Sequence, residues 1–266
     1  MRRYYREKRY YCGCYMDLYI FPTYESRKKV TRRKKDRKPT SAAQKKLNER
    51  HRKEKLARLL HANFTPEDIA LHLTYRDGEQ PEDDAAVKRD LWNYIRRIKR
   101  LRKKLGLPPL KYVATIEKGK RNGRYHIHFP AMSGDVDRDT LEKLWGKGYA
   151  NSLRLQFTEN GLVGLANYTT KSPLGGKSWY SSKNLIDPDP NVRDGKISAN
   201  KVQELAMDPS NRPEYEKLEA GYFLAEAETF YNDEFGGHYI IARYYRQDNV
   251  YIKPKKKRKG GKRNGD

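Results

Sequence analysis

The sequence predicts an α+β fold with a central antiparallel sheet and flanking helices. Composition and alternation typical of strands mark residues 68–75, 111–117 and 124–131. An amphipathic helix over residues 82–105 lies between the first two of these segments. Basic stretches precede and follow this core, so we also expect a basic N-terminal extension and a basic C-terminal tail.

The first 62 residues form the predicted extension. Residues 10–22 have the composition of a strand. Ser41 is a suitable N-cap for a polar helix over residues 42–62, which has no strong apolar stripe before Leu56. We expect this helix to act as a connector between the extension at residues 1–62 and the sheet.

Alternation in residues 68–75 predicts the first strand of the sheet. Its apolar face consists of Ile69, Leu71, Leu73 and Tyr75. The following helix begins after Pro81 and ends at Gly106, and its apolar residues recur three or four positions apart. The buried stripe consists of Leu91, Ile95, Ile98, Leu101 and Leu105, and the basic back of Arg96, Arg97, Lys99, Arg100 and Lys103.

A hairpin around residues 118–123 is expected to join the next two strands. Within a central domain at residues 63–190, the remaining expected elements are a helix at 139–145, a strand at 149–157 and a helix at 161–171. A C-terminal elaboration at residues 191–252 would add a helix at 199–207 and strands at 222–230 and 238–245. Residues 253–266 are expected to be a disordered basic tail.

The charge predicts a polyanionic partner. The 266 residues include 58 Lys and Arg against 34 Asp and Glu, a net charge of +24. Residues 27–38 and 253–266 carry +8 and +7, which leaves +9 on the rest of the chain. Because the folded part is basic as well as the two tails, nucleic acid is the favoured partner.

Several classes of protein are disfavoured. Cys12 and Cys14 are too few for a disulfide framework, which favours a reducing compartment. The sequence has no apolar run of membrane-spanning length, no signal peptide and no phosphate-binding loop. We therefore expect no membrane partner and a cytoplasmic location in a bacterial host. In a eukaryotic host, the basic segment 253–259 would indicate the nucleus.

Two histidines suggest a metal site. His126 and His128 are one residue apart in a predicted strand, so their imidazoles lie on the same face. Glu117, on the partner strand just before the turn, could supply a carboxylate ligand. Two nitrogens and one carboxylate suit Mn²⁺ or Mg²⁺. The alternative is a pair of half-buried histidines with hydrogen-bond partners and no metal.

Tyr168 and Lys171 lie about one turn apart on a predicted helix. A phenol, with a pKa of about 10, is a poor nucleophile at neutral pH and requires an activated electrophile. A metal bound to the scissile phosphate would provide it, and the lysine could stabilise the charge that develops. The reaction that fits is cleavage of single-stranded DNA with the tyrosine left joined to one end.

Motifs in residues 65–190 resemble the HUH endonuclease superfamily, specifically the rolling-circle replication initiators (Rep proteins) of plasmids and phages. They are Leu71-His-Leu-Thr-Tyr75, Glu117-Lys-Gly119, Arg124-Tyr-His-Ile-His-Phe129, Leu165-Ala-Asn-Tyr168-Thr-Thr-Lys171 and Trp179-Tyr-Ser-Ser-Lys183. The resemblance implies the HUH fold, a metal held by His126, His128 and Glu117, and attack by Tyr168. The products would be a 5′-phosphotyrosine and a free 3′-hydroxyl.

The partners implied are single-stranded DNA at an origin hairpin or nick site and a host helicase and polymerase. A single motif tyrosine would require a second subunit or a water molecule for termination. Tyr180 with Lys183 makes a second Y-x-x-K pair. A relaxase or transposase of the same superfamily and a non-catalytic nucleic-acid-binding protein are the alternatives. Pro130 stands where a hydrolase with an H-x-H-x-H motif would have its third histidine.

Overall fold

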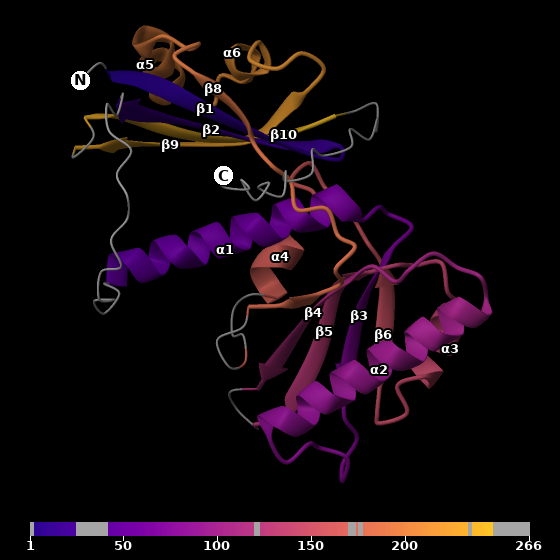
Figure 1. The fold of residues 1–266 in the computed structure, drawn as a ribbon. Coiled ribbons are helices and arrows are strands. Elements are labelled where there is room, and N and C mark those ends of the chain that lie inside the picture. Colours follow the sequence, from indigo (N-terminus) through magenta and orange to yellow (C-terminus); the bar gives the residue numbers. More distant parts are fainter. Residues whose placement is uncertain are drawn as a thin grey trace, which may run out of the picture. The chain divides into compact units, whose positions relative to one another are not determined.

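The computed structural model of the chain contains two compact units, each with its own sheet (Figure 1). One unit comprises residues 1–50 and 187–266, and the other comprises residues 51–186. The structure describes residues 3–24, 42–119, 123–169, 174, 178–233 and 236–246. The predicted tail at residues 253–266 therefore lies outside the described residues.

The first unit is a five-stranded antiparallel sheet with two helices on one face. The strand order is β8 (Asn191–Asp194), β1 (Arg3–Cys12), β2 (Tyr15–Tyr24), β10 (Gly237–Tyr245) and β9 (Phe223–Asn232). The helices are α5 (Ala199–Met207) and α6 (Arg212–Glu216). Alternate strand residues pack with these helices into one core, which includes Leu18, Ile20, Leu205, Tyr215, Ile240 and Tyr244.

The N-terminal segment corrects the prediction of a single strand at residues 10–22. Two strands are present, and they pair from Arg3↔Tyr24 to Cys12↔Tyr15 around a tight turn. Gly13 in this turn has φ of +69°, a conformation that glycine adopts without steric cost. The segment is therefore half of a packed sheet and not an extension. The alternating Tyr and Arg residues of β1 conceal a strand because its outer face is basic.

The second unit contains another five-stranded antiparallel sheet. Its order is β6 (Ala150–Arg154), β3 (Ile69–Thr74), β5 (Tyr125–Met132), β4 (Tyr112–Lys118) and β7 (Tyr180–Ser181). The hairpin predicted between the second and third strands is confirmed by the pairing of β4 with β5. The α+β class is also confirmed, but two sheets replace the single central sheet that we expected.

Helix α2 (Asp84–Lys104) covers one face of this sheet (Figure 1). The carboxylate of Asp83 caps the helix by accepting a hydrogen bond from the Ala86 N–H. The predicted apolar stripe is buried against β3 and β5, in a core that includes Leu91, Ile95, Ile98, Leu71, Leu73, Ile127 and Phe129. Burial of this face leaves the alternate residues of both strands on the opposite face.

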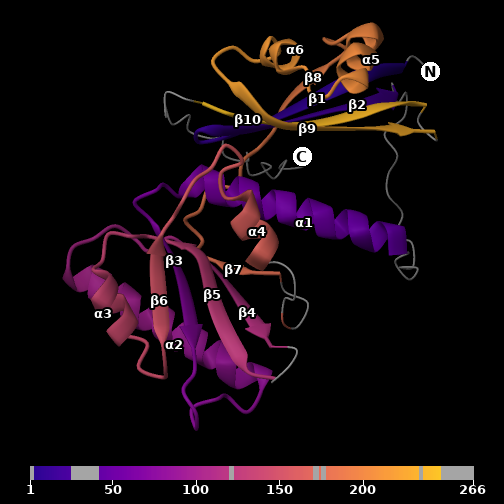
Figure 2. The same cartoon turned by 180° about the vertical axis from the view of Figure 1, so that it is seen from behind.

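Helices α1 (Ala42–Asn63) and α4 (Val163–Thr169) pack against that opposite face, as the view from behind shows (Figure 2). Their shared core includes Leu56, Leu60, Phe64, Val113, Ala131, Leu162 and Ala166. The end of α1 is thus a core element of the second unit and not only a connector. Helix α3 (Arg138–Lys143) packs beside β6. None of the helices in the described part of the chain is long and apolar enough to cross a membrane.

Candidate metal and tyrosine site

Three neighbouring strands direct polar side chains to the face that carries α4. His126 and His128 leave β5 on this face because Tyr125, Ile127 and Phe129 are buried on the other. The register places His72 of β3 opposite His128, and Glu117 of β4 opposite His126. The sheet therefore brings together the three predicted metal ligands, His126, His128 and Glu117, and adds a third histidine.

The rings and the carboxylate are in close contact. The imidazoles of His72 and His128 stack with their centroids 4.3 Å apart and their planes 4° from parallel. The His126 centroid lies 5.5 Å from that of His72 and 6.4 Å from that of His128. Glu117 Oε2 lies 3.5 Å from His128 Nε2. This separation allows both atoms to contact one cation.

Burial keeps the three imidazoles neutral. It lowers the pKa of His128 to about 4, with smaller contributions from His72 and His126. Burial also lowers the pKa of His72 and of His126. Neutral imidazole is the form that binds metal ions, so at pH 7 these side chains have lone pairs available.

Unsatisfied polar atoms surround the same point. His72 Nε2, His126 Nδ1 and Thr115 Oγ1 are buried without a hydrogen-bond partner among the described residues. Such atoms are costly unless something else occupies them. The donor set of imidazole nitrogens and a carboxylate fits a divalent cation. Within the described ranges, however, no three His, Cys, Asp or Glu residues are already arranged as a metal site. Binding would therefore require the stacked rings to turn.

Tyr168 lies beside the histidines, on α4. Its ring centroid is 6.0 Å from that of His128, edge to face at 85°, and the residue is 56% exposed. The start of the helix is held by His61 of α1, whose Nε2 accepts a 2.7 Å hydrogen bond from the Leu162 N–H. A rigid support thus presents an accessible phenol next to the imidazoles.

The other lysine and tyrosine candidates are placed differently. Lys171 lies outside the described residues. Tyr180 of β7 is 8% exposed, and its ring packs edge to face on Trp92 of α2, with centroids 5.5 Å apart. Because α2 covers the opposite face of the sheet, Tyr180 is directed away from the histidines. Of the two tyrosines in Y-x-x-K pairs, the sheet places Tyr168 on the histidine face.

His72 is a site residue that the sequence prediction missed. The signal was available, because Leu71 and Leu73 were assigned to the buried face of their strand and strict alternation places His72 on the other. What the sequence lacked was the register between β3 and β5, which pairs His72 with His128. His61 gave no comparable signal, because its partner is a backbone N–H about one hundred residues away.

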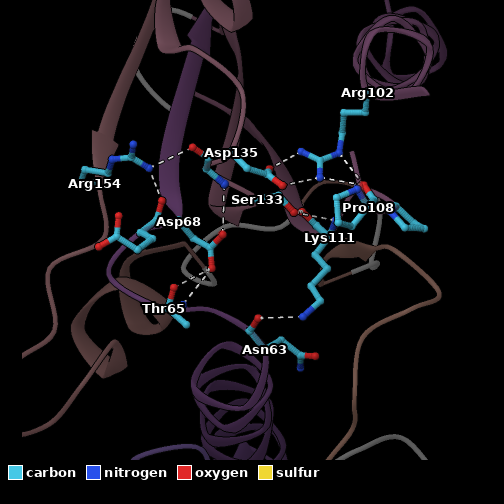
Figure 3. Close-up of a pocket in the computed structure, with 12 residues that line it drawn as sticks. Asn63, Thr65, Asp68, Arg102, Pro108, Lys111, Ser133, Asp135 and Arg154 are labelled. Carbon is cyan, nitrogen blue, oxygen red and sulfur yellow. Dashed lines mark hydrogen bonds and ion pairs between the residues drawn. The ribbon is translucent and has the colours of Figure 1, made fainter. Parts of the chain in front are cut away.

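A separate hollow of about 510 Å³ lies at the other end of the same sheet (Figure 3). Its charged groups bond to one another and to backbone. Arg102 donates to Asp135 and to the carbonyl of Pro108, and Asp68 accepts from the N–H groups of Thr65 and Gly134. This network joins the ends of several elements, which gives the hollow a structural role.

The comparisons with known proteins concern the segment that carries the histidines and the tyrosine. Residues 68–173 match the family model of the replication-associated protein ORF2. No curated protein and no solved structure matches the chain. The matched segment contains His72, Glu117, His126, His128, Tyr168 and Lys171. The part of the chain that forms the candidate site is therefore similar to replication-associated proteins of the ORF2 family.

Proposed function

We propose that this chain nicks and rejoins single-stranded DNA and so initiates rolling-circle replication, with Tyr168 as the nucleophile. One observation carries the proposal: an accessible phenol lies 6.0 Å, centroid to centroid, from an imidazole in a cluster of three histidines and a glutamate. The family similarity of residues 68–173 supports a role in replication. The net charge of +24 supports a nucleic-acid substrate.

His126, His128 and Glu117 would hold the divalent cation, Mn²⁺ or Mg²⁺. When bound, such an ion withdraws charge from a phosphate and makes its phosphorus more electrophilic. The phenol oxygen of Tyr168 then forms a bond to phosphorus while the bond from phosphorus to the 3′ oxygen breaks. The phenol proton is lost, and the leaving oxygen is protonated to a 3′-hydroxyl. One phosphodiester replaces another, so the reverse reaction rejoins the strand.

The remaining residues position these groups. His72 stacks on His128 and limits the rotation of that ring. His61 anchors the helix that carries Tyr168. Lys171, two residues after the end of α4, is proposed to stabilise the charge that develops on the phosphate. A host helicase and polymerase would act on the nicked strand, and a second subunit could complete termination.

The test is Tyr168→Phe, which removes only the phenol oxygen. Single-stranded oligonucleotides that tile the replicon are incubated with Mn²⁺, denatured and separated on a gel. With the unmodified protein, a 3′ label should migrate with protein, and a 5′ label should appear on a shortened, protein-free strand. Tyr168→Phe should give neither product and should bind DNA as before.

Tyr149→Phe and Tyr180→Phe are the matched controls. Tyr149 is 78% exposed, and Tyr180 is buried on the other face of the sheet. Both variants should still form the covalent product. Loss of linkage in Tyr180→Phe with retention in Tyr168→Phe would reverse the assignment of the nucleophile. The absence of any linkage in the unmodified protein would favour a non-catalytic nucleic-acid-binding protein.

A further inference from the structure

The outer face of α2 carries a row of basic residues that the proposed reaction does not use. Six cations of this helix are exposed: Arg89, Arg96, Lys99, Arg100, Lys103 and Lys104. None of them forms an ion pair with a residue in the described part of the chain. The only acidic residues of the helix are Asp84 in its first turn and Asp90, which is buried and paired with Lys147.

The row is straight. At about 100° per residue, Arg89, Arg96, Arg100 and Lys103 lie along one line, directly opposite the buried stripe of Leu91, Ile95 and Ile98. A rise of about 1.5 Å per residue spreads the row from Arg89 to Lys103 over about 21 Å. The sheet holds this helix rigidly because its apolar face is fully buried.

The position of these residues in the helix explains only part of the row. Cations in the last turn, such as Lys103 and Lys104, interact favourably with the helix dipole. Arg89 and Arg96 lie too far from that end to benefit. Arg96 and Arg100 are four residues apart on the same side, where like charges repel and weaken the helix. A polyanion along this face would relieve that repulsion.

We propose that the outer face of α2 binds duplex DNA that flanks the single-stranded cleavage site. This inference rests on the proposed function for its choice of DNA. A duplex presents regularly spaced phosphates on a stiff backbone, which suits a rigid row of cations. Single strands are bound mainly by stacking of bases on aromatic rings. The exposed aromatic residue of this helix is Trp92, which is 40% exposed and packs on Tyr180.

The two faces of the sheet would then have separate tasks. The histidines and Tyr168 lie on the face covered by α1 and α4, whereas the basic row lies on the outer side of the helix that covers the other face (Figures 1 and 2). The strand to be cut would occupy the first face. The adjoining duplex would run past the edge of the sheet to the second.

The test is the triple variant R89Q/R96Q/R100Q, with affinity measured by fluorescence anisotropy at several salt concentrations. The probes are a 30-base-pair duplex of arbitrary sequence and one of its strands. Removing one cation that neutralises a duplex phosphate lowers the slope of log K against log[salt] by about 0.9. We expect the duplex slope to fall by about 2 to 3 and the single-strand slope to change less.

Two controls separate position from charge. R193Q/K196Q/K217Q removes the same charge from exposed sites on the other unit and should leave the duplex slope higher than the α2 variant does. R89K/R96K/R100K preserves the charge on α2 and should preserve the slope. An equal fall for both glutamine variants, or an equal fall for duplex and single strand, would overturn the proposal.

Covalent linkage to single-stranded oligonucleotides, measured on the same variants, distinguishes this inference from the proposed function. The α2 variant should still form the linkage, since none of its three residues is in the site. Linkage with an unchanged duplex slope would overturn only the inference about α2. A reduced duplex slope in a protein that forms no linkage would overturn the proposed reaction and leave the duplex-binding face in place.

Discussion

Four side chains on one sheet face determine what the second unit can do chemically. His128 is stacked on His72, approached by Glu117 and bordered by the ring of Tyr168. None of these contacts satisfies the unpaired nitrogens of His72 and His126. A face that is stable as a scaffold but incomplete in its hydrogen bonds has the character of a binding site.

The metal hypothesis predicts what removal of each ligand does. His126→Ala or His128→Ala should abolish covalent linkage, and EDTA should do the same to the unmodified protein. Glu117→Ala should weaken Mn²⁺ binding, with partial recovery of linkage at high Mn²⁺. Mn²⁺ binding measured by calorimetry provides a readout independent of cleavage. Cleavage that persists in EDTA would refute the metal site for all three residues.

His72 is predicted to act through its stack on His128. His72→Ala removes the ring, and loss of a group that orients a ligand typically costs about 10- to 100-fold in metal affinity. His72→Phe keeps a flat ring of similar size and should recover most of that affinity. If the two variants bind Mn²⁺ equally poorly, the nitrogen of His72 is itself required.

At the scale of elements, helix α1 determines where α4 begins. The buried Nε2 of His61 accepts the Leu162 N–H, one of the backbone donors at the start of a helix that lack an intrahelical partner. His61→Ala leaves this donor unsatisfied, at a cost of about 1–3 kcal/mol in the free energy of unfolding. We expect the rate of linkage to fall because Tyr168 moves, while Mn²⁺ affinity stays nearly unchanged.

Chemical denaturation and Mn²⁺ titration of His61→Ala would separate these effects. His51→Ala, on an exposed position of the same helix, is the matched control and should behave as the unmodified protein. His61→Gln restores an acceptor and should recover part of the stability. A His61→Ala protein with full linkage activity would show that α4 holds its position without this hydrogen bond.

The elements also show how far the sequence could be read. Helix α2 and the hairpin of β4 and β5 were predicted because periodicity and turn residues are local signals. The strands β7 and β8 were missed because each is only two to four residues long and is defined by its partner. The same reason applies to His72, whose role depends on pairing between strands more than fifty residues apart.

At the scale of the whole molecule, one unit holds all the described residues proposed for the reaction. His72, Glu117, His126, His128 and Tyr168 lie within residues 51–186. A fragment of residues 42–190, which keeps α1 complete, should therefore fold, bind Mn²⁺ and form the covalent linkage with an oligonucleotide. Circular dichroism and the gel assay would check this. A folded fragment that binds Mn²⁺ without cleaving DNA would show that the other unit is needed for catalysis.

The order of the two units along the chain has a consequence for synthesis on the ribosome. The second unit is contiguous and can fold once residue 186 has emerged. Strand β2 is flanked in its sheet by β1 and β10, and β10 ends at Tyr245, 59 residues later. At roughly 5–20 residues per second, the hairpin of β1 and β2 waits about 3–12 s for its neighbour. Throughout that interval the nascent chain exposes an unpaired strand edge, the feature through which partly made proteins aggregate.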